Sequence, residues 1–298
     1  MAVKELTQPL KWHGGKGDLA GWIISLMPPR CKKPNNPDPS DPGWLHYVEP
    51  YFGGGAVLLA MDPEGISEVA NDINRQLANF WQTIQHQHTF ADFIRVVEAQ
   101  PFCEEDWQTS NRLRDAMGWH GVNLAEGTTN ACTARAAWFF VAVRQSLAGR
   151  MKGFASITRK RTRRGMNEQV SAWLNCIEGL PAVHERLKRV LIRNQPAIEV
   201  IRKEDGPRTL FYLDPPYLHE TRATTGEYAH EMSAVEHLEL LECLGRIKGR
   251  FLLSGYDSDL YASRQIGFGW KRHEKKINNH AAGGKKKRMM TECVWCNF

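Results

Sequence analysis

The chain has 298 residues, of which 42% are hydrophobic, enough for one large domain or for a domain with an inserted lobe. Its net charge of +6 is modest, so the distribution of the basic residues is more informative than their number. No apolar run is long enough to cross a bilayer and the amino terminus, MAVKELTQPLKW, has no signal-peptide core, which together predict a cytoplasmic protein.

The first ninety residues predict the alternation of strands and helices that is typical of a parallel sheet. The proline-rich residues 31–43 are expected to form a surface loop, and LHYVEP, from Leu45, a short buried strand. A glycine turn then opens a helix in YFGGGAVLLAM, a second strand follows in ISEVANDIN, and RQLANFWQTIQ is an amphipathic helix. This order predicts the α/β class.

From residue 91 to residue 187 the pattern becomes mainly helical, so we expect an insert there. Its helices are expected in ADFIRVVEAQ, DWQTSNRLRDAM, ARAAWFFVAVRQSLAG, VSAWLNCIEGL and AVHERLK. Gly, Pro and a basic loop at residues 150–165 would interrupt them, and HERLK should be an ordinary helix surface. The main domain would then be discontinuous, formed by residues 1–90 and 188–298.

The last third of the chain returns to strands, so the sheet is built from both ends of the chain. RVLIRN and TLFYL are expected strands, AVEHLELLECLGRI a helix and GRFLLSGY a strand, and two last strands flank a turn at AAGG. Two prolines cannot continue a strand, so in TLFYLDPPY the chain must leave the sheet at Asp214. Open α/β sheets bind ligands at the carboxyl ends of their strands, which makes DPPY a candidate site.

The residues of DPPY suit chemistry on the exocyclic amino group of a nucleobase, whose lone pair is delocalised into the ring. The Asp214 carboxylate and the Pro215 carbonyl can both accept hydrogen bonds from such a group and orient its lone pair. Tyr217 can stack on a base that has been extruded from the helix. An ordinary turn at the end of a strand, with Tyr217 as packing, is the alternative interpretation.

The stretch EPYFGGG places three glycines at a turn between a strand and a helix, where the backbone can approach a ligand closely. Alone this is a weak signal, because it does not match the spacing G-x-G-x-x-G. Asp72 lies at the end of the next predicted strand, where an acid can accept hydrogen bonds from ribose hydroxyls. It could equally be the cap of the following helix.

Four motifs, KWHGGK, VEPYFGGGAVLL, NDIN and YLDPPY, occur in this order, and together they resemble the Dam-type family of DNA adenine-N6 methyltransferases. The resemblance spans nearly the whole catalytic portion. It implies a Rossmann-like methyltransferase sheet, S-adenosylmethionine as the methyl donor, and flipping of an adenine out of double-stranded DNA. The resemblance also implies a target-recognition insert before DPPY and a reaction that needs no metal. A phage, prophage or restriction-modification origin, in a bacterial or phage-infected cell, is expected.

The resemblance assigns roles to residues of this chain. The cofactor set is Trp12, Lys16, Glu49, Phe52, Gly53, Gly54, Gly55, Asp72, Ile73 and Asp214. The residues that hold the target base are Asp214, Pro215, Pro216 and Tyr217. The candidate DNA-binding residues of the insert are Arg144, Arg150, Lys152, Arg159, Lys160, Arg161, Arg163 and Arg164.

The basic loop is the main departure from the family. Between Arg150 and Arg164 seven residues are Lys or Arg and none is acidic, and WKRHEKK from Trp270 and GGKKKRMM from Gly283 are also basic. Such clusters attract phosphate backbones, although a solvated basic face explains a single cluster equally well. The loop echoes the pattern RxNxxGxFN of the GATC-methylating members only loosely. Because phosphate contacts do not read sequence, we hypothesise a relaxed or very short target site.

Other functions stay open at this point. They are a catalytically silent, methylase-like DNA-binding protein and a methyltransferase acting on RNA, on cytosine N4 or on protein amides; the protein-amide motif more often begins with Asn. The spacing of CVWC suits a metal, but no second pair lies nearby and its side chains should point to opposite faces of a strand, so no zinc site is expected. The scattered cysteines predict free thiols. Residues 219–232 could form a loop that closes over the base, or a simple connection.

Overall fold

The computed structural model describes residues 6, 8–12, 14–32, 40–116, 132–218, 231–278 and 289–298. The chain divides into two compact units, each assembled from three stretches. The first unit consists of Met1–Gly21, Gly53–Asp62 and Asp72–Asn194, and the second of Trp22–Phe52, Pro63–Asn71 and Gln195–Phe298. The residues 91–187 expected as an insert all fall in the first unit.

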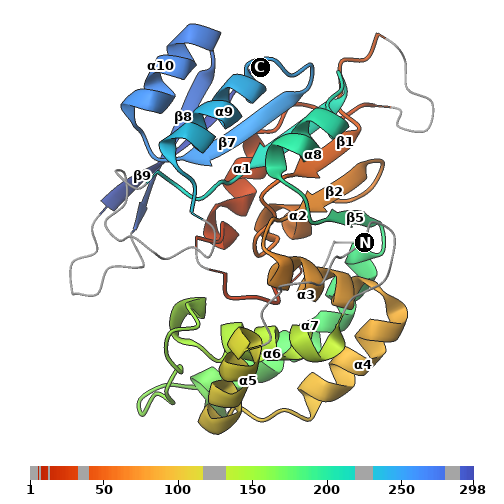
Figure 1. Cartoon of the computed structure of the whole chain (residues 1–298), viewed down its shortest axis with the longest axis vertical. Coiled ribbons are helices and arrows are strands. Elements are labelled where there is room, and N and C mark those ends of the chain that lie inside the picture. The colour runs from red at the N-terminus through yellow and green to blue at the C-terminus, as the bar shows by residue number, and fades with distance from the viewer. Residues whose placement is uncertain are drawn as a thin grey trace. The chain divides into compact units, whose positions relative to one another are not determined.

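The second unit contains most of the central sheet (Figure 1). Six strands lie there in the order β2-β1-β6-β7-β9-β8. Their bounds are β1 His46–Glu49, β2 Ser67–Asn71, β6 Thr209–Leu213, β7 Arg250–Gly255, β8 Lys271–Asn278 and β9 Met289–Cys296. The strands β2, β1, β6 and β7 are parallel, whereas β9 runs antiparallel to β7 and β8. This mixed, mostly parallel sheet confirms the predicted α/β, Rossmann-like class.

Three helices cover one face of this sheet: α8 (Ala197–Glu204), α9 (Ala234–Leu244) and α10 (Asp259–Phe268). Their buried side chains pack on strand residues such as Phe211 and Phe251 in one hydrophobic core. Helix α9 was predicted, and it begins with a capping box between Ser233 and Glu236. Helices α8 and α10 were not predicted; both are short and present few core residues.

The first unit is mainly helical, and Figure 1 shows α4, α5, α6 and α7 packed together. Its elements are α2 Ala56–Ala60, α3 Arg75–Gln85, α4 Gln87–Glu98, α5 Glu104–Ala116, α6 Thr133–Arg144, α7 Glu168–Leu187 and strand β5 Val190–Arg193. Helix α1 (Ala20–Leu26) crosses from this unit into the second. Aromatic rings fill the core of the bundle: Phe140 stacks on Phe80 at 5.7 Å and meets Trp173 at 5.4 Å.

Helix α7 is longer than the sequence predicts. The expected break near Gly179 and Pro181 is wrong, because one helix of 20 residues runs through both positions. An internal proline costs about 3 kcal/mol through its missing N–H and its ring. The side chains of Leu180 and Val183, both fully buried, flank Pro181, and their packing offsets that cost.

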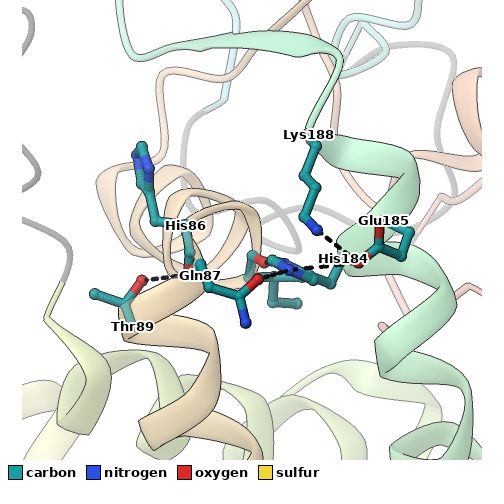
Figure 2. Close-up of polar contacts among 7 residues, drawn as sticks. His86, Gln87, Thr89, His184, Glu185 and Lys188 are labelled. Carbon is teal, nitrogen blue, oxygen red and sulfur yellow. Dashed lines mark hydrogen bonds and ion pairs between the residues drawn. The ribbon is translucent and has the colours of Figure 1, made fainter.

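The prediction that HERLK is an ordinary helix surface is also wrong. His184 is buried; its ring stacks on Phe90 at 4.2 Å, and its nitrogens face Ile84 O at 2.6 Å and Gln87 Oε1 at 3.0 Å (Figure 2). The buried Arg186 donates to Leu58 O at 3.0 Å. Only the ion pair between Glu185 and Lys188 lies on the surface. This stretch therefore ties α7 to α2, α3 and α4.

All seven cysteines lie in the described part of the chain and are free thiols, as predicted. Burial raises the pKa of Cys293, on β9, to about 11, so this thiol stays protonated near neutral pH. Among the described residues no group of three or more His, Cys, Asp or Glu side chains could hold a metal ion. None of the helices that the structure describes is long and apolar enough to span a membrane.

Candidate active site

The segment DPPY begins where the ladder of β6 ends. All five residues of β6 are buried, and the last pair in its ladder with β7 is Leu213 with Leu253. Asp214 follows directly and is half-buried, Pro215 is buried and Pro216 half-buried. Since neither proline has an N–H to donate, the strand ends here and presents the Asp214 carboxylate at the carboxyl end of a central parallel strand.

Tyr217, the last residue of the motif, is held on two sides. Its hydroxyl donates a hydrogen bond to the buried Glu292 of β9, and its ring meets the edge of Tyr256 at 4.6 Å and 74°. Burial, together with the carboxylates of Glu292 and Asp214, raises the pKa of Tyr217 well above its ordinary value. The phenol therefore remains neutral and acts as the donor.

Glu49 and Phe52, two expected cofactor contacts, belong to the same unit as DPPY. Glu49 is buried and accepts a hydrogen bond of 2.7 Å from the hydroxyl of Tyr47. Phe52 is buried, and its N–H donates to Asn71 O at 2.8 Å. Burial, and then the charge of Glu49, raises the pKa of Tyr47 well above its ordinary value. Tyr47 therefore stays neutral beside the Glu49 carboxylate, as Tyr217 does beside Glu292.

In the first unit the glycine turn lies against Trp12. Gly53 and Gly55 have φ values of 52° and 71°, which favour glycine. A Cβ on Gly54 would lie 2.8 Å from Trp12 Cβ, and one on Gly53 would lie 3.0 Å from Trp12 Cδ1. Trp81 Nε1 also donates to Gly53 O at 3.0 Å. The turn therefore needs glycine both for its backbone and for the close approach of the Trp12 side chain.

Asp72 connects this turn to the start of α3. Its Oδ2 accepts the Gly53 N–H and its Oδ1 the Asn74 N–H, both at 2.9 Å. The cap of α3 is Asn74, whose side chain accepts from the N–H groups of Gln76 and Leu77. The alternative interpretation of Asp72 as the helix cap is therefore wrong. Next to it, Ile73 exposes 43% of its surface, a large fraction for an apolar side chain.

The described residues of the KWHGGK motif, all but His13, form a tight turn. Gly15 N–H donates to Trp12 O at 3.0 Å, and Gly14 has a φ of 75°. Lys16 is buried, and its Nζ donates to Gly14 O at 3.0 Å. The Trp12 ring lies 6.1 Å from Phe139 of α6. The amino-terminal motif is thus packed on the helical bundle as well as on the glycine turn.

Lys11, which no sequence pattern marked as a site residue, has an unusual environment. Its Nζ donates to Gln169 Oε1 at 3.4 Å, and its carbonyl oxygen would be only 1.7 Å from a Cβ on Gly149. Burial, and then the charge of Arg144, lowers the pKa of Lys11 to about 8. Lys11 therefore lies directly against Gly149, the residue before the basic segment that begins at Arg150.

Replacing Lys11 by Met is expected to remove a pH dependence of stability. Because the pKa of Lys11 is about 8 in the folded protein and ordinarily 10.5, the unfolded chain binds more protons between these values. By linkage, the wild type therefore gains stability relative to Lys11→Met as the pH rises through this window. Urea unfolding of both proteins at about pH 7.5 and about pH 10 measures the difference; a constant difference contradicts the lowered pKa.

The basic cluster lies largely on the surface. Lys152, Arg159, Lys160, Arg161, Arg163 and Arg164 are exposed and Arg150 is half-buried. Strands β3 (Thr162–Arg163) and β4 (Met166–Asn167) form a hairpin whose two turn residues have positive φ, as in a type I′ turn. Arg164, in that turn, makes a bidentate ion pair with Glu178 at 2.9 and 3.0 Å.

Arg144 differs from the other DNA-binding candidates. It is 8% exposed, and its Nη2 donates to Ala172 O of α7 at 2.8 Å. The backbone just after it is strained, because the non-glycine residues Ala148 and Met151 have φ values of 54° and 57°. Hydrogen bonds such as Leu147 N–H to Gly153 O, at 2.9 Å, hold this segment in place.

Each unit thus gathers part of the predicted set. The first unit brings Trp12, Gly53, Gly54 and Asp72 together, and the second holds Asp214 to Tyr217 with Glu292, which the sequence reading missed. An acid in the middle of the apolar strand MMTECVWC was the available signal for Glu292. Most of the possible loop at residues 219–232, and residues 279–288 with the AAGG turn, lie outside the described residues.

Comparison with known proteins agrees with these motifs. Residues 12–132 match the family described as D12 class N6 adenine-specific DNA methyltransferase. The chain is 23% identical to the type II methyltransferase M.MjaIII of Methanocaldococcus jannaschii, over 97% of the chain and 98% of that protein. It is 24% identical to the type II methyltransferase M1.LlaDCHI of Lactococcus lactis subsp. cremoris, over 97% of the chain and 94% of that protein. Over residues 12–132 the chain is therefore similar to the D12 class N6 adenine-specific DNA methyltransferases, and these similarities show that it is an enzyme.

Proposed function

We propose that this enzyme transfers a methyl group from S-adenosylmethionine to N6 of an adenine flipped out of double-stranded DNA. The observation that carries the proposal is the half-buried carboxylate of Asp214 at the carboxyl end of β6, followed by two prolines and the restrained ring of Tyr217. The match to an adenine-specific family supports adenine rather than cytosine as the base. The relatives' names support the class of type II methyltransferase.

The proposed chemistry depends on orienting a poor nucleophile. Asp214 and the Pro215 carbonyl oxygen accept hydrogen bonds from the adenine amino group, which turns its lone pair out of conjugation with the ring. The proton that the nitrogen loses passes to an oxygen of Asp214. Tyr217 supports the flipped base by stacking, and Pro216 stiffens the segment between them. The cofactor, when bound, supplies a methyl group already activated by its sulfonium charge.

The residues of the first unit fit S-adenosylmethionine. The glycine turn against Trp12 offers a compact wall without side chains, and we assign Gly53, Gly54 and Gly55 to it. We assign Asp72 to the ribose hydroxyls, since a carboxylate can accept several hydrogen bonds at once, and the exposed Ile73 to the adenine. Lys16, Glu49, Phe52 and Asp214 complete the proposed cofactor set on the family resemblance.

Replacing Gly54 by Ala is expected to weaken S-adenosylmethionine binding about tenfold, or about 1.4 kcal/mol. The new Cβ would lie 2.8 Å from Trp12 Cβ, so Trp12 must shift from the wall that we assign to the cofactor. Isothermal titration with S-adenosylmethionine measures the change. Gly21→Ala is the control, because a Cβ there meets nothing within 4 Å, and equal affinities of both variants would contradict the assignment.

For DNA, we propose that residues 91–187 are the recognition insert of a catalytic domain formed by residues 1–90 and 188–298. The exposed Lys and Arg side chains of the basic cluster would bind DNA phosphates. The buried Arg144 would stabilise the helical bundle that carries this cluster. Because such contacts position DNA without reading it, we propose relaxed specificity. We also propose a cytoplasmic location, which the proposed DNA substrate and cofactor support.

The decisive experiment incubates the purified chain with S-adenosylmethionine and unmethylated DNA of diverse sequence, and then maps modified bases by single-molecule sequencing. N6-methyladenine spread over many contexts is the expected result. N6-methyladenine at one strict motif would support the proposed reaction but overturn the proposed relaxed specificity. N4-methylcytosine in place of N6-methyladenine would show that cytosine, and not adenine, accepts the methyl group. The absence of modified DNA bases would overturn the proposal in favour of an RNA substrate or a catalytically silent DNA-binding protein.

A further inference from the structure

Glu292 is an acid in the middle of a buried strand. It lies on β9, is 1% exposed, and has the partly buried Met290 and the fully buried Val294 two residues away on the same face. Burying a carboxylate costs several kcal/mol unless hydrogen bonds compensate for the lost water. A strand that only closed the sheet would be more stable with an apolar residue here. The buried carboxylate therefore points to a function of Glu292 beyond closing the sheet.

That partner is the ring that ends DPPY. The hydroxyl of Tyr217 donates to Glu292 Oε1, and the ring packs edge-on against Tyr256. Tyr256 is in turn restrained by β9, since its hydroxyl donates to Met290 Sδ at 3.8 Å. One hydrogen bond at the tip of the Tyr217 ring and one contact at its side leave little freedom to rotate or tilt. Both restraints lead back to the same face of β9.

We propose that Glu292 is a positioning residue for methyl transfer, which holds the ring of Tyr217 in the orientation that receives the flipped base. The inference rests on the proposed function, because it requires that Tyr217 contacts the base. A stacking surface is useful only when its plane is fixed before the base arrives, since ordering it during the reaction would raise the barrier. The strand β9 then serves the reaction as well as the sheet.

The test compares two replacements of Glu292 with one of Tyr217. Glu292→Gln keeps an acceptor oxygen and the shape, Glu292→Met keeps the volume without an acceptor, and Tyr217→Phe removes only the donor. The methylation of unmethylated DNA is measured at saturating S-adenosylmethionine, with cofactor affinity determined separately. We expect Glu292→Met and Tyr217→Phe each to lower kcat about tenfold, with cofactor affinity unchanged, and Glu292→Gln to retain most activity.

The double variant decides between positioning and simple destabilisation. If the two groups act as one unit, Tyr217→Phe with Glu292→Met loses no more kcat than either single change. Additive losses, wild-type kcat in Glu292→Met, or equal losses in Glu292→Gln and Glu292→Met would each overturn the inference. Should Glu292→Met not fold, the contrast between Tyr217→Phe and Glu292→Gln still decides it. A wild-type chain that methylates no DNA would refute the proposed function instead, which separates the two failures.

Discussion

Replacing Asp214 by Ala is expected to lower kcat for DNA methylation by about a thousandfold, the upper range for loss of one preorganised electrostatic contact. The half-buried carboxylate at the end of β6 is the proposed acceptor of the amino-group proton, and Ala supplies no acceptor there. DNA affinity, measured by fluorescence anisotropy, should stay within about twofold of the wild type, because the proposed phosphate contacts lie in the basic cluster. Turnover is measured at saturating cofactor.

Two further variants sharpen this experiment. Asp214→Asn keeps one acceptor oxygen but cannot take up a proton, so it should lose less activity than Asp214→Ala and still fall far below the wild type. Asp259→Ala, which changes an exposed acid in the first turn of α10, is the control and should keep wild-type turnover. If Asp214→Ala methylates DNA at the wild-type rate, the assigned role of Asp214 is refuted.

Replacing Gly149 by Ala is expected to destabilise the first unit by about 3 kcal/mol, the sum of a steric and a backbone cost. The new Cβ would lie 1.7 Å from Lys11 O, which is backbone and cannot turn aside, and Gly149 has a φ of 72°. Relief requires that the segment after α6 moves away from Lys11 and so from the neighbouring Trp12. Thermal unfolding and urea denaturation measure the loss of stability.

Two other glycines of the basic segment serve as matched controls. Gly165 has a φ of 74° but a Cβ there meets nothing within 4 Å, so Gly165→Ala isolates the backbone strain and should cost about 1 kcal/mol. A Cβ on Gly153 would meet nothing within 4 Å, and this residue is not in the left-handed region. Gly153→Ala should therefore change the free energy of unfolding by no more than about 0.5 kcal/mol. Equal stabilities of the three variants would show that the contact with Lys11 is not tight.

The sequence by itself determined those features that depend on neighbouring residues. Two adjacent prolines forced the chain out of the sheet after Asp214, because proline fixes φ and cannot donate to a ladder. The apolar run TLFYL identified a strand that is buried throughout, and the period of RQLANFWQTIQ identified α3 with its bounds. The order of the four motifs revealed the resemblance to the adenine-specific DNA methyltransferases, and the match over residues 12–132 agrees with it.

Only the tertiary structure decided the features that depend on partners distant in the chain. The sequence left open whether Asp72 caps α3, and the structure shows that Asn74 is the cap, because its side chain accepts from the N–H groups of Gln76 and Leu77. Helix α7 continues through Pro181 because buried side chains on both sides outweigh a local cost. The partner of Tyr217 lies 75 residues away on another strand. Local rules fix backbone angles and periodicity, whereas the burial of a polar or charged side chain depends on which distant group is brought to meet it.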